Sequence, residues 1–203
     1  MVSMHRPSHL HALCLFLGLW LLTGCANSLD MSDRQLSRVE PNEGLVIGSI
    51  LVDAHEVPSR SWTTSLFGRK AAGFTYDFEI VHVTETDPQG EFPYADRYEL
   101  EVEPGVERTF MARLKAGDYL IKRFHHEGLS AMGGGVGVLF SVDPGMTQYV
   151  GRLRLSLPER VTLGTGFTFR VENAHDETVA AVKAVKQIVP QPVVNVPMHA
   201  RSR

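Results

Sequence analysis

From residue 44 to residue 172 the sequence repeatedly alternates apolar and polar side chains, and this period of two constrains the fold more than any other feature. Tyr98, Leu100 and Val102, for example, alternate with glutamates. Successive side chains of a strand point to opposite faces, so such runs give sheets with one buried and one wet face, as antiparallel sheets often have. About eight strands are expected, at 45–52, 74–80, 98–102, 110–114, 119–124, 137–142, 149–157 and 167–171.

Turn-forming residues separate these runs, as at Pro104-Gly105 and Asp143-Pro144-Gly145. The run at 45–52 is rich in β-branched residues, which predicts a strand near the middle of a sheet. A valine stripe that begins with acidic residues and ends before Pro190 predicts one helix at 176–188. The spacing favours a sandwich over a barrel. We therefore predict a mainly β protein: a single antiparallel β-sandwich domain at 44–189 with a C-terminal helix, followed by an extended tail at 190–203.

The N-terminus has the pattern of a secretion signal. Arg6 precedes an apolar run at 10–22 whose thirteen residues reach roughly 20 Å, well short of the ~30 Å of a bilayer core. The following Leu22-Thr23-Gly24-Cys25 resembles the bacterial lipobox. The resemblance implies that 1–24 is a cleaved signal peptide and that Cys25 carries acyl chains such as palmitate, which would anchor the chain permanently. The alternative is a secreted protein cut near Gly24 with an unmodified Cys25.

The lipobox resemblance also predicts a location. Ala26 follows the cysteine, and the lipoprotein sorting rule retains chains with Asp at that position in the inner membrane. We therefore expect an anchor in the outer membrane, facing the periplasm. Residues 25–43 are polar without clear periodicity and predict a flexible tether with a mean reach of roughly 23 Å.

Composition excludes several kinds of site. Both cysteines, Cys14 and Cys25, lie in the targeting region, so the domain has no disulfide and no thiolate metal ligand. Without the signal segment the chain has 19 Lys and Arg against 23 Asp and Glu, which gives no electrostatic footprint for nucleic acid.

Two stretches resemble a known family. Leu114 to Ile121 has the turn-and-strand pattern L-x-x-G-x-Y-x-φ, where φ is apolar, and it resembles carboxypeptidase-regulatory-like, or transthyretin-like, β-sandwiches. Phe140 to Gly151 is similar to a stretch of bacterial lipoproteins of that kind. The resemblance covers roughly residues 97–157 and implies a sandwich but no catalytic residue. A type VI secretion lipoprotein also uses such a sandwich, but its characteristic loop is not found in this sequence.

Candidate catalytic and metal-binding motifs are weak. The adjacent His125 and His126 would point to opposite faces of a strand and could not easily bind one metal ion. No Gly-x-Ser-x-Gly motif supports a nucleophilic serine. The glycine run at 133–137 lacks the Lys-Ser/Thr of a phosphate loop. We interpret Gly128–Gly137 as a loop between strands that could move to admit a partner.

The stretch from Ala54 to Gly73 is long for a connection in a compact domain, and such loops are often functional. It holds the candidate contact residues Trp62, Phe67, Arg69 and Lys70. These side chains could contact lipid headgroups or a partner protein. Alternatively, Trp62 and Phe67 fold back and plug the sandwich.

The sequence leaves three hypotheses for function. The preferred one is a membrane-anchored, non-catalytic binding or assembly module, with an envelope protein or a glycan as partner and no cofactor. The second is a structural envelope lipoprotein without a specific ligand. A histidine-dependent metal hydrolase is the least favoured, because no acid, base and nucleophile can be placed together.

Overall fold

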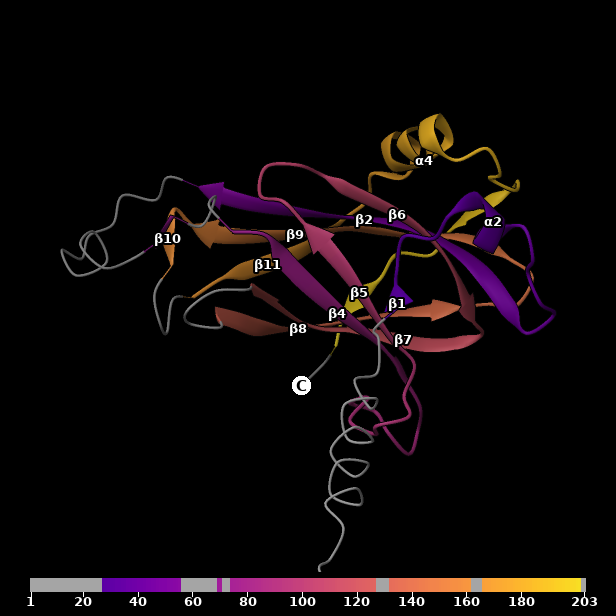
Figure 1. The fold of residues 1–203 in the computed structure, drawn as a ribbon, viewed down its shortest axis with the longest axis horizontal. Coiled ribbons are helices and arrows are strands. Elements are labelled where there is room, and N and C mark those ends of the chain that lie inside the picture. The colour runs from indigo at the N-terminus through magenta and orange to yellow at the C-terminus, as the bar shows by residue number, and fades with distance from the viewer. Residues whose placement is uncertain (1–26, 56–68, 71–73, 127–131, 162–165, 202–203) are drawn as a thin grey trace, which may run out of the picture.

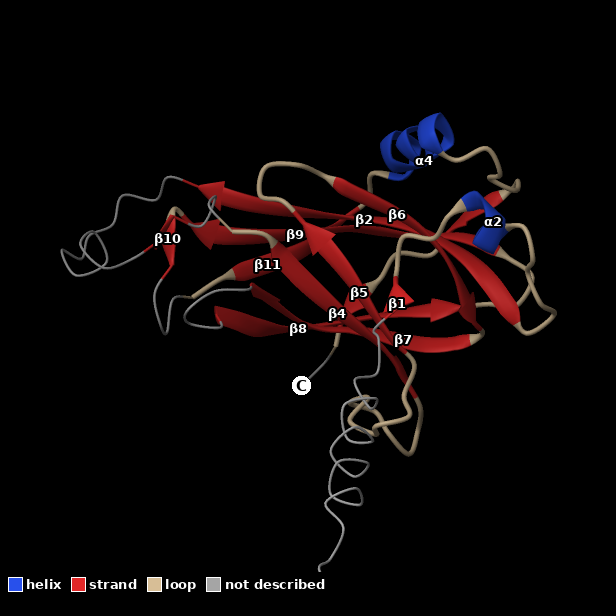
Figure 2. Cartoon of the chain, in the orientation of Figure 1, coloured by secondary structure: helices blue, strands red, loops and turns tan. Residues whose placement is uncertain are grey.

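The computed structural model describes residues 27–55, 69–70, 74–126, 132–161 and 166–201. Two sheets pack face to face around one core, with few helical residues (Figures 1 and 2). This confirms the predicted mainly β sandwich with a C-terminal helix, and a strand lies at each of the eight expected positions. Within the described ranges, no helix is both long enough and apolar enough to span a bilayer.

The first sheet has six strands, in the order β1 (Asn27–Ser28), β5 (Arg97–Val102), β4 (Tyr76–Val83), β7 (Gly117–His126), β8 (Met132–Val142) and β13 (His199–Ala200). The second sheet has the order β11 (Thr168–Glu172), β9 (Thr147–Pro158), β2 (Glu43–His55) and β6 (Arg108–Lys115), with β12 (Val193–Asn195) also paired to β9. A separate ribbon joins β3 (Arg69–Lys70) to β10 (Arg160–Val161). The helices are α2 (Asp33–Leu36) and α4 (His175–Val185).

Strand β2 lies between β9 and β6, which confirms the central position expected from its β-branched run. The sheets are not antiparallel throughout, however, because β2 and β9 run parallel, as do β1 and β5 and also β12 and β9. These partners are far apart in sequence, so no hairpin sets their relative direction. The expectation of a purely antiparallel sandwich is corrected in these three pairs.

The residues from 27 to 43, which we call the N-terminal strap, pack on the domain. The Leu29 amide donates to the Glu99 carbonyl of β5 at 2.9 Å, and the Met31 amide donates to the Met111 carbonyl of β6 at 3.1 Å. The strap therefore links the two sheets along one edge of the sandwich. Its apolar side chains Leu29, Met31 and Leu36 are buried. From Asn27 onward this corrects the expectation of a free tether. Three apolar side chains are enough to pack the segment on the domain. Their spacing shows no periodicity, so nothing in the sequence indicated this packing.

Residues 193–201, which we call the C-terminal strap, lie along the opposite edge. β12 pairs with β9 of the second sheet, and β13 then pairs with β8 of the first. The segment expected as an extended tail is thus extended but paired to both sheets. α4 covers the outer face of the second sheet with Thr178, Val179 and Val182 buried. The helix ends at Val185, so it is shorter at its C-terminal end than the predicted 176–188. Val185 itself is exposed.

Candidate functional site

Three consecutive glycines occupy the first half of β8, where the sequence predicted a loop. A Cβ atom on Gly133 would lie 2.2 Å from the Phe124 carbonyl oxygen of β7, and one on Gly134 would lie 2.2 Å from the Phe167 ring. These two positions therefore need glycine, because a neighbouring backbone and an aromatic ring approach closely. The loop prediction is corrected, since it treated glycine as a strand breaker and could not anticipate these close approaches.

Gly135 differs from its two neighbours. A Cβ atom there would meet nothing nearer than the Lys122 carbonyl oxygen at 3.9 Å, so the space beside this residue is open. Gly133 and Gly135 pair with His125 and Arg123, whose side chains are partly exposed on the outer face of the first sheet. The missing side chains leave a hollow on that face.

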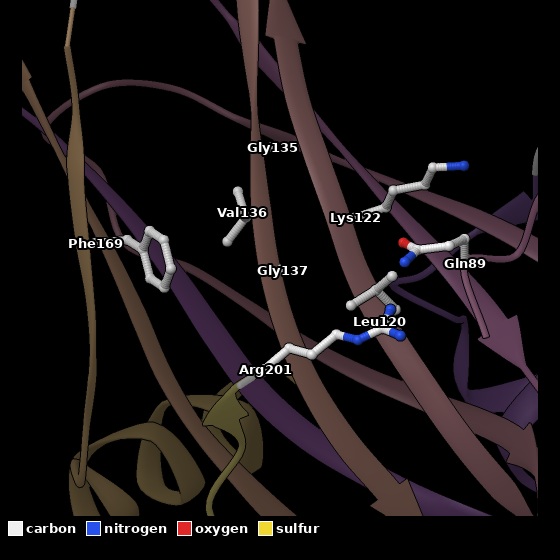
Figure 3. A pocket seen from close by; sticks show the side chains of 8 residues that line it. All are labelled: Gln89, Leu120, Lys122, Gly135, Val136, Gly137, Phe169 and Arg201. Carbon is white, nitrogen blue, oxygen red and sulfur yellow. The ribbon is translucent and has the colours of Figure 1, made fainter. Parts of the chain in front are cut away.

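Two adjoining pockets, of about 480 and 660 Å³, share Lys122 and Gly135, and we call them together the β8 groove. Figure 3 shows that the Arg201 side chain crosses β8, between Phe169 and Val136 on one side and Leu120, Lys122 and Gln89 on the other. The wider pocket is lined by Lys122, Arg123, Phe124, His125 and Gly133–Gly135.

The edge of β8 is only half covered. β13 pairs with Val138 and Leu139, and the Arg201 amide donates to the Gly137 carbonyl at 2.8 Å. Among the residues that the structure describes, no strand pairs with 133–136 on this side. Unpaired backbone N–H and C=O groups of this kind form a template for another strand.

The β4–β5 loop, residues 84–96, forms the other margin of the groove. Arg201 Nη1 donates to the Pro88 carbonyl at 2.9 Å, and Lys122 Nζ lies 2.8 Å from Glu91 Oε1. The hydrogen bond from Lys122 is the largest effect on the Glu91 carboxyl and lowers its pKa. Both ties cross the groove, so they hold the loop beside it.

The same loop is stiffened from inside by Asp87. Its carboxylate accepts hydrogen bonds from the amides of Glu91 and Phe92, both at 2.8 Å. Burial by itself raises the pKa of Asp87, but these backbone hydrogen bonds and the nearby Lys122 and Arg97 lower it overall. The loop is therefore a fixed wall at neutral pH.

Glu79 lies under the loop and is nearly buried. Its carboxylate contacts Arg97 Nη1 at 2.5 Å and also pairs with Arg123 Nε. Arg97 in turn donates to the Gly90 carbonyl at 2.8 Å. Two guanidinium groups share one carboxylate here, and Arg201 contacts a neutral carbonyl instead of a carboxylate. Positive charges therefore slightly outnumber negative ones at the margins of the groove.

The histidine pair lies on opposite faces of β7, as the alternation of a strand predicts. The His126 ring is buried and stacks on Phe74 with ring centroids 4.1 Å apart. The His125 side chain is 40% exposed, and its Nε2 lies 3.9 Å from Asp77. Within the described ranges, no three His, Cys, Asp or Glu side chains gather closely enough to hold a metal ion.

The site residues proposed from the sequence fall in a different part of the chain. Cys25, Trp62 and Phe67 lie outside the described residues, while the backbone of Arg69 and Lys70 forms β3 and pairs with β10. Sequence reasoning did not find the lining residues Gln89, Lys122, Phe169 and Arg201. The glycine run was the available signal, but it showed neither its strand conformation nor the side chains around it.

Comparison with known proteins adds little to this description. No protein-family model matches the sequence, and no curated protein matches it either, so the resemblance to carboxypeptidase-regulatory-like domains stays a prediction. Among solved structures, the chain is similar to the crystal structure of the T6SS lipoprotein TssJ1 from Pseudomonas aeruginosa. The identity is 10% and the TM-score is 0.28, over 66% of this chain and 99% of that one. A likeness this distant carries no argument about function.

Proposed function

We propose that this protein is a non-catalytic, lipid-anchored module of the bacterial envelope that binds an extended segment of a partner protein along the open edge of β8. The observation that carries the proposal is that, among the residues that the structure describes, no strand pairs with 133–136 on the side of β8 away from β7, beside the β8 groove. An extended segment added to a sheet edge gains affinity from main-chain hydrogen bonds, while adjoining pockets select its side chains.

The protein already accepts one added strand on this edge. β13 comes from the far end of the chain and pairs with Val138 and Leu139, directly next to the open stretch. Gly135 presents no side chain and the space beside it is open, so a second backbone can approach closely there. A partner segment in line with β13 would extend the first sheet, and its side chains would enter the groove.

The groove is suited to binding rather than to chemistry. The polar groups of its smaller pocket are the Gln89 amide, the Lys122 ammonium and the Arg201 guanidinium. None of these is a nucleophile with an adjacent general base, which covalent catalysis would require. His125 lines the wider pocket, but its Nε2 lies 3.9 Å from the nearest carboxylate and has no nucleophile beside it among the lining residues.

The predicted lipid anchor at Cys25 would determine which membrane the module is attached to. The lipobox resemblance supports acylation of this residue, and the alanine after it supports the outer membrane, facing the periplasm. Cys25→Ser should therefore block acylation and the cleavage that depends on it, so the protein should incorporate no labelled palmitate, stay longer by the uncleaved signal peptide and leave the outer-membrane fraction. Unchanged processing and fractionation of this variant would contradict the anchor.

Site-specific photo-crosslinking in cells tests the binding edge. A photoreactive residue at Gly135, where a side chain has open space, should give one discrete adduct that maps to one short segment of one protein. A probe at Glu101, exposed on β5 of the same sheet, is the matched control and should not give that adduct. A peptide of the mapped segment should bind the purified protein at least about tenfold more weakly after Gly135→Trp, a loss of about 1.4 kcal/mol.

The opposite results would overturn the assignment. An adduct common to positions 135 and 101, or none at 135, would mean that the β8 edge has no partner. The structural lipoprotein without a ligand would then be the better description.

A further inference from the structure

The predicted lipid attachment lies very close to the folded domain. Consecutive Cα atoms are 3.8 Å apart, so Cys25 lies within about 7.6 Å of Asn27, where β1 begins. β1 runs parallel to β5 with Asn27 opposite Tyr98. Because β5 starts at Arg97, the beginning of β1 lies at the end of β5 that the β4–β5 loop enters (Figure 1). Asn27, two residues after the predicted lipid attachment, therefore lies at the end of the domain from which this loop extends.

The β4–β5 loop exposes two aromatic side chains at this place. Phe92 is 37% exposed and Tyr94 is 80% exposed, and their ring centroids are 5.2 Å apart. They are the only aromatic residues among the large exposed hydrophobic side chains of the described part of the chain. A Tyr beside a Phe has the amphipathic character of residues at membrane interfaces, with an apolar ring and a polar tip.

The loop holds the aromatic pair in a fixed position. The Phe92 amide donates to Asp87 Oδ2 at 2.8 Å, and the Phe92 carbonyl accepts from Arg97 at 3.3 Å and from the Ala95 amide at 3.1 Å. A loop that is already ordered loses little conformational entropy when it enters an interface. A mobile loop would not present both rings together.

We propose that Phe92 and Tyr94 insert into the headgroup region of the same membrane that holds Cys25. This inference rests on the lipid anchor of the proposed function and deepens it. The domain would then sit on the bilayer with the β4–β5 loop facing it and would not swing at the end of a tether. Two contacts, one covalent lipid and one aromatic pair, would hold the β8 groove at a constant orientation to the membrane.

A fluorescent probe between the two aromatics tests this arrangement. The folded domain contains no cysteine, so Pro93→Cys in the full-length lipidated protein gives a single free thiol for the environment-sensitive dye NBD. In phosphatidylethanolamine–phosphatidylglycerol vesicles we expect a blue shift, a severalfold rise in intensity, and quenching by lipids that carry a nitroxide high on the acyl chain. Phe92→Ser with Tyr94→Ser in the same labelled chain should remove all three effects.

The matched control is a label at Val106, which is 56% exposed in the turn at the opposite end of β5. Its fluorescence should be that of a dye in water whether or not vesicles are present. If the chain floats with the vesicles but the label at 93 remains as wet as the label at 106, the membrane contact is wrong and the anchor stands. If the chain does not float with vesicles, both the anchor and the contact are wrong.

Discussion

The two edges of the sandwich are finished in different ways. Along the β5–β6 edge, the N-terminal strap bonds to the backbone of both sheets and buries Leu29, Met31 and Leu36. Along the β8–β9 edge, the C-terminal strap pairs with both sheets, and no strand of the described part of the chain pairs with residues 133–136 on that side. The first edge buries apolar surface, which stabilises the fold, whereas on the second no described strand covers the main-chain groups of 133–136, where we propose that a partner binds. Under the proposed function, stability and recognition therefore belong to opposite edges.

The largest effect is expected from weakening the closed edge. Leu36 of α2 is 1% exposed, so Leu36→Ala should lower the free energy of unfolding by about 2–4 kcal/mol, through lost burial and the cavity left behind. Urea unfolding followed by circular dichroism measures the change. Val39→Ala, at a position 41% exposed in the same strap, should stay within about 0.5 kcal/mol. Equal, small effects of both substitutions on the free energy of unfolding would instead support the free tether predicted from the sequence.

At the open edge, two adjacent glycines should respond in opposite directions. Gly134→Ala should destabilise by about 1–3 kcal/mol, because its Cβ atom would overlap the Phe167 ring. Gly135→Ala should stabilise by about 0.5–1 kcal/mol, because glycine in a strand loses more backbone entropy and the site has room. Melting temperatures of the two variants compare them directly. The same sign for both would mean that the groove is not open at residue 135.

A smaller effect is expected where α4 meets the N-terminal strap. Lys186 Nζ lies 2.7 Å from the Met31 carbonyl and 2.9 Å from Asp30 Oδ1. Lys186→Met keeps the apolar stem but loses both contacts, so it should cost about 1 kcal/mol. Lys186 directly follows α4, and the matched variant is Lys183→Met, at an exposed position in the last turn of that helix, which should change the free energy of unfolding by less than about 0.5 kcal/mol. If both variants lowered the free energy of unfolding by a similar amount, the two Lys186 contacts would not be what holds α4 to the N-terminal strap.

The smallest effect should be confined to the wall of the groove. Asp87 has a lowered pKa in the folded protein, below the usual value of about 3.9. Its contribution is therefore present above about pH 4 and is lost as the pH falls through the folded pKa. NMR titration should show the Phe92 and Glu91 amides shifting in that acidic range, while amides of the N-terminal strap shift less. Protonation of Asp87 at or above pH 4 would contradict the anchoring of the loop.

Much of the fold followed from local pattern. The alternation at 98–102 and at 149–157 depends only on neighbouring residues, and both strands formed as predicted. The β-branched run at 45–52 also placed β2 correctly in the interior of a sheet. The parallel pairing of β2 with β9 could not be derived, because their register depends on contacts between residues about one hundred positions apart.

The candidate site shows the same division. The glycine run drew attention as a place that could admit a partner, yet its role as a strand edge depends on Phe167 and on the β7 backbone. Arg201 and Gln89 are single polar residues in segments without a pattern. Nothing near them in sequence indicates that they border one groove.

The sequence alone determined the parts whose physics is local: where strands and turns occur, which side of each strand is apolar, and that the domain has no thiol chemistry. Only the tertiary structure decided which edge of the sandwich is closed and which is open. An edge is covered where a segment from elsewhere in the chain pairs with it, and that depends on where distant strands such as β1 and β13 lie.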